Sequence, residues 1–323
     1  MSTMNDLNGS KIAIVGIGFI GRAWAISFAR AQADVKLWDP AEGAANKAIE
    51  YISGVLEDLK SNDLLSGQST ADILSKISRA KTLPEALEGA VYVQENCPEI
   101  LATKKELFAK LDTLAAPDTI LASSTSALLP SLFTEGLAGA NRCLVVHPIN
   151  PPYLIPAAEV VPSLWTRPDV VKKARDILIA AGHAPLVMKK ELDGFIMNRL
   201  QGALLEEAFR LVAGGYATVD DIDIGIRDGL ALRWSFMGPF ETMDLNAPGG
   251  VRDYAARYEP IYKTMFPQMQ WRVDWQGDTM NVVEGQRRKS LAQQQLGNRQ
   301  VWRDRRLMAL AAHKKEADLE YGR

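Results

Sequence analysis

Three glycines near the start of the chain constrain its fold more than any other feature. Gly16, Gly18 and Gly21 form a G-x-G-x-x-G pattern between the short β-branched run at residues 12–15 and a helix-forming stretch at residues 22–32. A tight turn joining a buried strand to a helix needs glycine where the backbone bends and where the helix packs on the strand. We therefore expect a strand, a glycine-rich turn and a helix in that order.

Short apolar runs separated by amphipathic stretches continue through the first half of the chain. They lie at residues 35–38, 91–93, 120–122, 144–146 and 185–188. Alternation of this kind favours an α/β fold with a doubly wound, mostly parallel sheet of the Rossmann type. Between residues 39 and 91, apolar side chains recur at three- and four-residue spacing, which predicts a helical insertion.

The pattern changes near residue 190. From Gly194 onward no convincing run of strands is present, and residues 196–215 are typical of a long helix that ends at glycines 214 and 215. We therefore expect a Rossmann domain over residues 1–190 and an all-helical domain over residues 191–323.

Composition excludes several classes of protein. The chain is 47% hydrophobic and 24% charged with a net charge of -2, which is ordinary for a globular protein and lacks the basic excess that binds nucleic acid. Two cysteines, Cys97 and Cys143, give little material for disulfides or a metal site, so we expect no metal and a reducing, cytoplasmic location. The polar residues 1–10 lead directly into the first strand, so we expect neither a signal peptide nor a membrane span.

An acidic residue stands at the end of the second expected strand. Asp39 follows Gly16 by 23 residues, a spacing at which an acid accepts hydrogen bonds from both ribose hydroxyls and repels the 2′-phosphate of NADP. Gly18 lets the backbone approach a pyrophosphate, and the helix that follows offers N–H groups to it. These residues together predict an NAD site, whereas the glycines alone would also fit a tight turn without a ligand.

His147 is the candidate catalytic base. It ends the run CLVV and opens HPINPP, which places it at the carboxyl edge of the sheet, where such folds bind ligands. Imidazole titrates near neutral pH and suits proton removal during alcohol oxidation, although a loop histidine bonded to nearby backbone is the alternative. Glu159, within IPAAEVV, is costly to bury unless paired, and a carboxylate can orient a histidine ring. Serines 123, 124 and 126 also follow a strand, where capping a helix is their default role.

Seven segments carry a resemblance to a known family. They are GIGFIGRAWA, VKLWD, QENCPE, ASSTSALLP, HPINPPYLIP, DGFIMNRL and LRWSFMGPFETMDLN, and they span nearly the whole chain. In these segments the chain resembles the 3-hydroxyacyl-CoA dehydrogenase superfamily, and most closely its short members, L-gulonate 3-dehydrogenase with the related lambda-crystallin, and L-carnitine dehydrogenase. The resemblance implies an NAD-dependent dehydrogenase that forms a homodimer through its helical domain.

The resemblance also implies roles for individual residues. It assigns the catalytic histidine to His147 and the glutamate that orients it to Glu159. A serine and an asparagine that hold the substrate correspond to Ser126 and Asn198. Positions that line the cofactor cleft correspond to Glu95, Lys104, Ser124 and Asn150.

Arg233 departs from the acyl-CoA enzymes of the superfamily. In LRWSFMGPF, an arginine and a tryptophan replace small residues, and a guanidinium can clamp a free carboxylate that a thioester lacks. A salt bridge inside the helical domain is the alternative. We therefore expect oxidation of a small L-3-hydroxy acid, L-gulonate foremost. The alternatives are a 3-hydroxyacyl-CoA such as 3-hydroxybutyryl-CoA, L-carnitine, and a non-catalytic NAD-binding, crystallin-like role.

Overall fold

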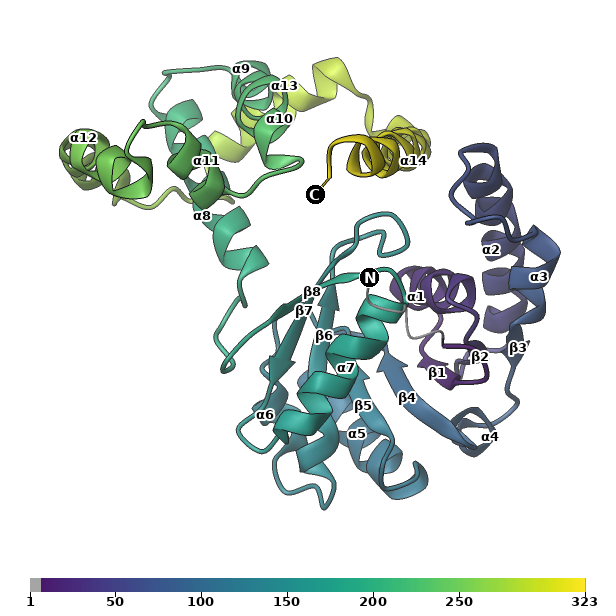
Figure 1. The fold of residues 1–323 in the computed structure, drawn as a ribbon. Helices are drawn as coiled ribbons and strands as arrows, with labels where there is room; N and C mark the ends of the chain where they lie inside the picture. Colours follow the sequence, from purple (N-terminus) through teal and green to yellow (C-terminus); the bar gives the residue numbers. More distant parts are fainter. Residues whose placement is uncertain (1–6, 323) are drawn as a thin grey trace. The chain divides into compact units, whose positions relative to one another are not determined.

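The computed structural model describes residues 7–322, which fall into two compact units (Figure 1). Unit 1 runs up to Met197 and also takes in Trp302–Glu320, and unit 2 comprises Asn198–Val301 with the end of the chain from Tyr321. The sequence assigned residues 302–320 to the helical domain, whereas here they pack with unit 1. The domain boundary expected at residues 190 and 191 stays a prediction.

An eight-stranded sheet forms the centre of unit 1. Its strands are β1 (Lys11–Val15), β2 (Asp34–Trp38), β3 (Ile77–Arg79), β4 (Ala90–Glu95), β5 (Ile120–Ser123), β6 (Cys143–Pro148), β7 (Ala157–Pro162) and β8 (Ala184–Val187). They lie in the order β3-β2-β1-β4-β5-β6-β7-β8. All neighbours pair in parallel except β6 and β7. The doubly wound, mostly parallel sheet expected from the sequence is therefore confirmed.

Successive side chains of the central strands point to opposite faces of the sheet, and both sets are buried, since helices cover both faces. Ile12 and Ile14 of β1 belong to one core cluster, and Ala13 and Val15 belong to the other. The first cluster packs against α1 (Phe19–Arg30), α2 (Ala44–Ser61), α3 (Thr70–Ser75) and α7 (Pro168–Ala180). The second packs against α4 (Leu83–Leu87), α5 (Leu101–Leu114) and α6 (Pro130–Thr134).

The last helix of the chain, α14 (Leu296–Tyr321), contributes to the first core cluster. Met308 is buried there, Arg305 pairs with Asp58 of α2 at 3.3 Å, and Lys315 pairs with Asp63 at 3.1 Å. The helical insertion of unit 1 is thus held by residues from the far end of the sequence.

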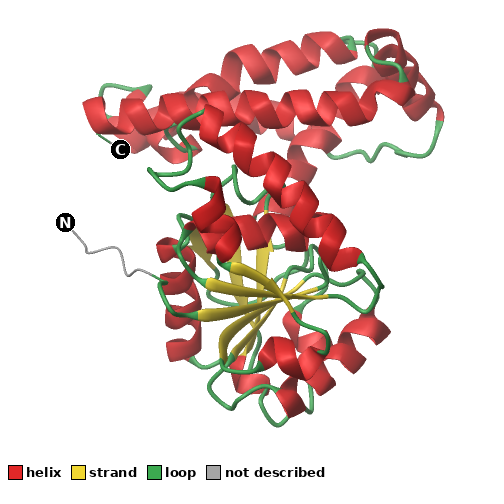
Figure 2. Cartoon of the chain, turned by 90° about the vertical axis from the view of Figure 1, so that its right-hand side faces the viewer, coloured by secondary structure: helices red, strands yellow, loops and turns green. Residues whose placement is uncertain are grey.

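The described residues 198–301 of unit 2 form helices joined by turns and loops, with no strand among them, and helices are red in Figure 2. It comprises most of α8 (Met197–Ala213), α9 (Val219–Ile224), a π-helical turn at Gly225–Leu230, α10 (Ala231–Trp234), α11 (Pro239–Leu245), α12 (Gly250–Met265) and α13 (Asp278–Ser290). A Rossmann-type sheet followed by a helical domain is the architecture expected from the sequence.

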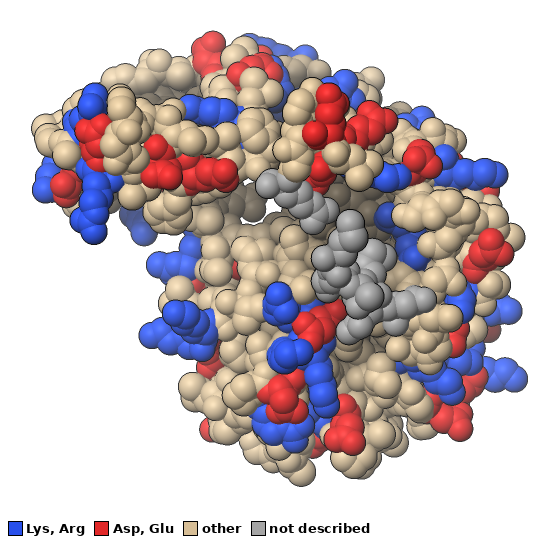
Figure 3. Space-filling model, in the orientation of Figure 1, with Lys and Arg blue, Asp and Glu red and all other residues tan. Residues whose placement is uncertain are grey.

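Charged side chains of both signs are intermixed on the face drawn in Figure 3. Many charged side chains of the described residues form ion pairs, such as Arg167 with Asp169 and Lys172 with Asp176. Ion pairs of this kind mark a solvated surface and contribute little to stability.

Candidate active site

The glycine turn between β1 and α1 leaves an open cradle beside the start of the helix. Gly16 has a φ of +80°, and a Cβ there would lie 3.0 Å from backbone atoms of Asn96 and Cys97. A Cβ on Gly21 would lie 2.0 Å from the carbonyl oxygen of Gly16, so the helix packs directly on the turn. At Gly18, the N-cap of α1, a Cβ would meet no atom within 4 Å.

This cradle fits a dinucleotide pyrophosphate. Gly18 caps α1 without a side-chain hydrogen bond, and the first turn of the helix carries no acidic residue. The first N–H groups of a helix have no carbonyl partners within it, and the helix dipole favours an anion at that end. The space beside Gly18 is where the negative charge of a cofactor would be stabilised.

Asp39 is held beside the turn by two backbone hydrogen bonds. Its Oδ2 accepts a hydrogen bond from the N–H of Ile17 and its Oδ1 accepts one from the N–H of Ala41, both at 2.9 Å. A carboxylate has about four acceptor sites, so these contacts orient Asp39 and leave acceptors for ribose hydroxyls.

His147 and Glu159 form a buried pair across two strands. They are directly opposite in the antiparallel register of β6 and β7, and His147 Nδ1 lies 2.7 Å from Glu159 Oε2. Glu159 is fully buried and His147 is 6% exposed. An ionised carboxylate can only accept, so in this hydrogen bond Nδ1 is the donor and Nε2 is the ring nitrogen left to accept a proton.

A tight turn before α8 supplies the other partners of Glu159. Gly194 and Phe195 both have positive φ, at 75° and 49°, and the turn presents the N–H groups of Ile196 and Met197 to Glu159 Oε1 at 2.6 and 2.9 Å. The left-handed region is uncommon for a residue such as phenylalanine. Because Oε1 accepts from the two N–H groups and Oε2 contacts His147, the carboxylate is fixed on both oxygens and holds the imidazole in one orientation.

The remaining substrate candidates lie in three places. Ser126 follows β5 and is exposed at the carboxyl edge of the sheet. Asn198 is in the first turn of α8 and lines a cavity of about 660 Å³ in unit 2, together with Arg199 and Arg272. Arg233 of α10 is exposed and donates to Asn246 Oδ1 at 3.4 Å, an amide oxygen and not a carboxylate.

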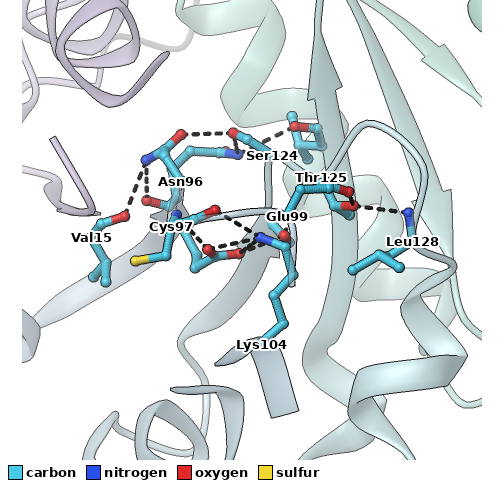
Figure 4. Close-up of polar contacts among 12 residues, drawn as sticks. Val15, Asn96, Cys97, Glu99, Lys104, Ser124, Thr125 and Leu128 are labelled. Carbon is cyan, nitrogen blue, oxygen red and sulfur yellow. Dashed lines mark hydrogen bonds and ion pairs between the residues drawn. The ribbon is translucent and has the colours of Figure 1, made fainter. Parts of the chain in front are cut away.

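Glu95 and Lys104, two of the expected cofactor-cleft residues, pair with each other inside the protein. Lys104 Nζ lies 3.0 Å from both carboxylate oxygens, and the two side chains are 0% and 1% exposed (Figure 4). Glu95 also accepts from the Cys97 N–H at 2.6 Å and from the Ser123 hydroxyl at 2.5 Å. With these contacts the pair fixes the turn after β4, and the expected place of both residues at the cofactor cleft stays a prediction.

Asn150 presents an unused acceptor. Its Oδ1 is buried and has no hydrogen-bond partner, and leaving such an atom unpaired costs about 1–3 kcal/mol. Asn150 follows β6, the strand that carries His147, so a ligand donor bound at this edge would satisfy the atom. This observation supports the expected role of Asn150 at the cleft.

Sequence reasoning missed four residues at this edge. Gln94 and Asn96 flank Glu95 and bond to Ser124, and Trp24 bonds to the same serine. Glu99 accepts from the Ala127 N–H and from the Thr125 hydroxyl, and the bond from Thr125 is drawn in Figure 4. The signal was available for three of them, because QENCPE places polar side chains directly after an apolar strand. Nothing in the sequence near Trp24 indicates its hydrogen bond.

Two other groups are unsuited to the chemistry. Burial and the nearby Glu95 carboxylate raise the pKa of the Cys97 thiol to about 12, which removes the thiolate at neutral pH. Burial lowers the pKa of His183 to about 4, and its ring packs on Trp24 with centroids 4.8 Å apart. His183 is therefore a poor proton acceptor near neutral pH.

Within residues 7–322, no three His, Cys, Asp or Glu side chains are grouped so as to hold a metal ion. Across the same residues, no helix combines the length and apolar character that a membrane crossing requires.

Comparison with protein families decides the class. Residues 11–192 match the NAD binding domain of 3-hydroxyacyl-CoA dehydrogenase, and residues 194–278 match its C-terminal domain. The chain belongs to the 3-hydroxyacyl-CoA dehydrogenase family. Its cofactor is NAD, and its general activity is that of an NAD-dependent dehydrogenase.

Individual relatives span nearly the whole chain. Lambda-crystallin of Oryctolagus cuniculus is 39% identical over 308 residues, covering 94% of this chain and 96% of that protein. L-carnitine dehydrogenase of Pseudomonas putida is 39% identical over 252 residues, covering 78% and 77%. The resemblance found in the sequence motifs is thereby confirmed.

Solved structures agree with this family. An NAD+-dependent 5-formyl-3-hydroxy-2-methylpyridine 4-carboxylic acid 5-dehydrogenase superposes with a TM-score of 0.79 at 27% identity, covering 97% of this chain and 99% of that one. The 3-hydroxybutyryl-CoA dehydrogenase of Escherichia coli gives a TM-score of 0.67 at 26% identity, covering 88% and 58%.

Proposed function

We propose that this dehydrogenase oxidises a small L-3-hydroxy acid, L-gulonate foremost, to the 3-oxo acid. The buried pair of His147 and Glu159 at the carboxyl edge of the sheet carries the proposal. The structural likeness to a dehydrogenase whose name specifies a small carboxylic acid supports the proposal.

The residues of this chain would handle the proton and hold the substrate. When bound, NAD supplies the acceptor for the hydride. His147 Nε2 takes the hydroxyl proton, and the Glu159 carboxylate at 2.7 Å from Nδ1 stabilises the imidazolium that forms. Following the resemblance, we assign the holding of the reacting oxygen to the Ser126 hydroxyl and the Asn198 amide.

Substrate choice would depend on Arg233. Its exposed guanidinium is paired with the amide oxygen of Asn246 at 3.4 Å and forms no ion pair with a carboxylate among residues 7–322. It can exchange the amide contact for a bidentate bond to a substrate carboxylate. L-carnitine also carries a carboxylate, and the match to L-carnitine dehydrogenase keeps it as the second candidate.

Turnover of a panel of hydroxy acids tests the substrate. Purified protein is assayed for NADH formation with L-gulonate, L-carnitine, 3-hydroxybutyrate and 3-hydroxybutyryl-CoA, and we expect the highest kcat/KM with L-gulonate. Activity on the CoA ester alone would overturn the proposal. Tight NADH binding without turnover of any compound would favour a non-catalytic role of the kind that the name lambda-crystallin suggests.

A second copy of the chain is the proposed partner of unit 2. Large apolar side chains of this unit are exposed, among them Phe236, Phe240 and Leu245 at 69%, 80% and 68%. Exposed apolar surface of this extent is typical of an interface. We place the homodimer in the cytoplasm, where the free thiols of Cys97 and Cys143 would stay reduced.

A further inference from the structure

One serine hydroxyl joins three side chains at the carboxyl edge of the sheet. Ser124 Oγ accepts hydrogen bonds from Trp24 Nε1 at 3.0 Å and from Gln94 Nε2 at 2.7 Å. It donates to Asn96 Oδ1 at 2.7 Å, a bond drawn in Figure 4. A hydroxyl offers one donor and two acceptor sites, so all three are used. The partners come from α1, from β4 and from the turn after β4.

One arm of this network reaches the glycine turn. Asn96 Nδ2 donates to the carbonyl oxygen of Val15 at 3.3 Å, and the Asn96 N–H donates to the same oxygen at 2.7 Å (Figure 4). Val15 directly precedes Gly16, whose Cα faces the Asn96 backbone so closely that a Cβ would lie 3.0 Å from it. Asn96 is therefore bonded to the turn and packed directly against it.

The other arm reaches the strand of the catalytic base. Gln94 Nε2 donates at 3.2 Å to the carbonyl oxygen of Val146, the residue before His147. Its Oε1 accepts the Tyr92 hydroxyl at 2.6 Å, and both side chains are fully buried. The Gln94 amide is thus bonded at both ends within the core, where such a bond is strong and its loss is costly.

We propose that Gln94 and Ser124 are positioning residues that hold the glycine turn and the His147 strand in the relative position that hydride transfer requires. The inference rests on the proposed function, because this placement affects catalysis only if His147 is the base. An apolar residue at position 94 would fill the same core without burying an amide. A buried amide is useful here if its hydrogen bonds fix the position of the catalytic groups, since misplacing reacting groups by about 1 Å can cost about 100-fold in rate.

Gln94→Met is the decisive variant. It keeps an unbranched side chain of similar length and removes the amide, and as a buried residue Gln94 cannot itself touch a bound cofactor. We expect a rise of about tenfold or more in the Kd for NADH, measured by fluorescence titration, and a similar fall in kcat/KM. Ser124→Thr, which keeps the hydroxyl, should lose less of both than Ser124→Ala, which removes it.

Thr119→Val is the matched control. The Thr119 hydroxyl is buried and donates to the carbonyl oxygen of Ala90 at 2.7 Å, so it joins β4 and β5 at the opposite edge of the sheet. We expect its melting temperature to fall as in Gln94→Met, while NADH affinity and kcat/KM stay within about twofold of the wild type. Equal kinetic effects in the two variants would overturn the proposal.

A double variant tests whether Gln94 and Ser124 affect catalysis through the same hydrogen-bond network. If they do, Gln94→Met/Ser124→Ala loses no more kcat/KM than the worse single variant, whereas independent effects multiply. Multiplied losses would overturn the proposal. The NADH titration needs no substrate, so a wrong substrate assignment leaves it readable, and a wild-type chain without dehydrogenase activity would defeat the proposed function separately.

Discussion

Replacing His147 by alanine removes the imidazole paired with Glu159 and leaves the glycine turn untouched. We expect turnover to fall by about two to four orders of magnitude, the usual value of general acid and base catalysis. NADH affinity, measured by fluorescence titration, should stay close to that of the wild type. If turnover were retained, the substrate proton would have to leave by another route.

Replacing Asp39 by alanine removes the carboxylate that lies beside the turn. We expect NADH to bind much more weakly and NADPH to lose less, because the charge that repels a 2′-phosphate is gone. Asp34→Ala, at the start of the same strand, is the matched control and should leave both affinities unchanged. An unaltered preference in Asp39→Ala would show that another group contacts the ribose.

His183 links protonation to stability. Burial lowers its pKa in the folded protein to about 4 from an ordinary value of 6.5, so between these values the unfolded chain binds a proton that the native protein does not. The free energy of unfolding should therefore fall as the pH drops from about 6.5 to 4. His183→Asn, which can still donate to the Pro156 carbonyl as Nδ1 does, should show a weaker dependence in denaturant titrations. The exposed His313→Asn should match the wild type, and an equal slope in all three proteins would contradict this origin.

At the scale of elements, a substitution in the glycine turn can weaken cofactor binding without changing the stability of the fold. A Cβ at Gly18 meets no atom within 4 Å, so Gly18→Ala should melt like the wild type while its methyl group occupies the pyrophosphate cradle and weakens NADH by about tenfold or more. Gly54→Ala within α2, where a Cβ also meets no atom, should leave NADH affinity unchanged and raise stability slightly. Unchanged NADH affinity in Gly18→Ala would place the pyrophosphate elsewhere.

The elements that the sequence predicted are those with a strong local signal. Six expected apolar runs became strands, and the expected helix at residues 196–215 is α8. Two strands were not anticipated. β3 has three residues, of which one is buried, and β7 runs antiparallel to β6 because the connection between them is too short for a crossover.

The residues of the candidate site could be predicted from the sequence, but most of the contacts between them could not. A carboxylate within an apolar segment needs a partner, and the structure places Glu159 opposite His147. Distances such as the one between Ser124 and Trp24 depend on how α1 packs on β4 and β5, which local patterns do not encode. Packing of that kind is set by the tertiary fold.

At the scale of the whole molecule, the exposed apolar side chains of unit 2 predict a dimer. Sedimentation velocity should give twice the chain mass of 35.5 kDa. Phe240→Asp should shift the protein toward the monomer, because a charge in an apolar interface is costly. Leu164→Asp, at an equally exposed leucine of unit 1, should sediment as the wild type does, and a monomeric wild type would refute the prediction.

The return of α14 to unit 1 has a consequence for how the protein is made. Met308 lies in the core beneath α2, and Arg305 and Lys315 pair with Asp58 and Asp63. During synthesis, the nucleotide-binding half emerges from the ribosome before α14, so its last contacts form only when residues 305–315 follow. That half therefore stays incomplete, and open to chaperones and proteases, until α14 has been made.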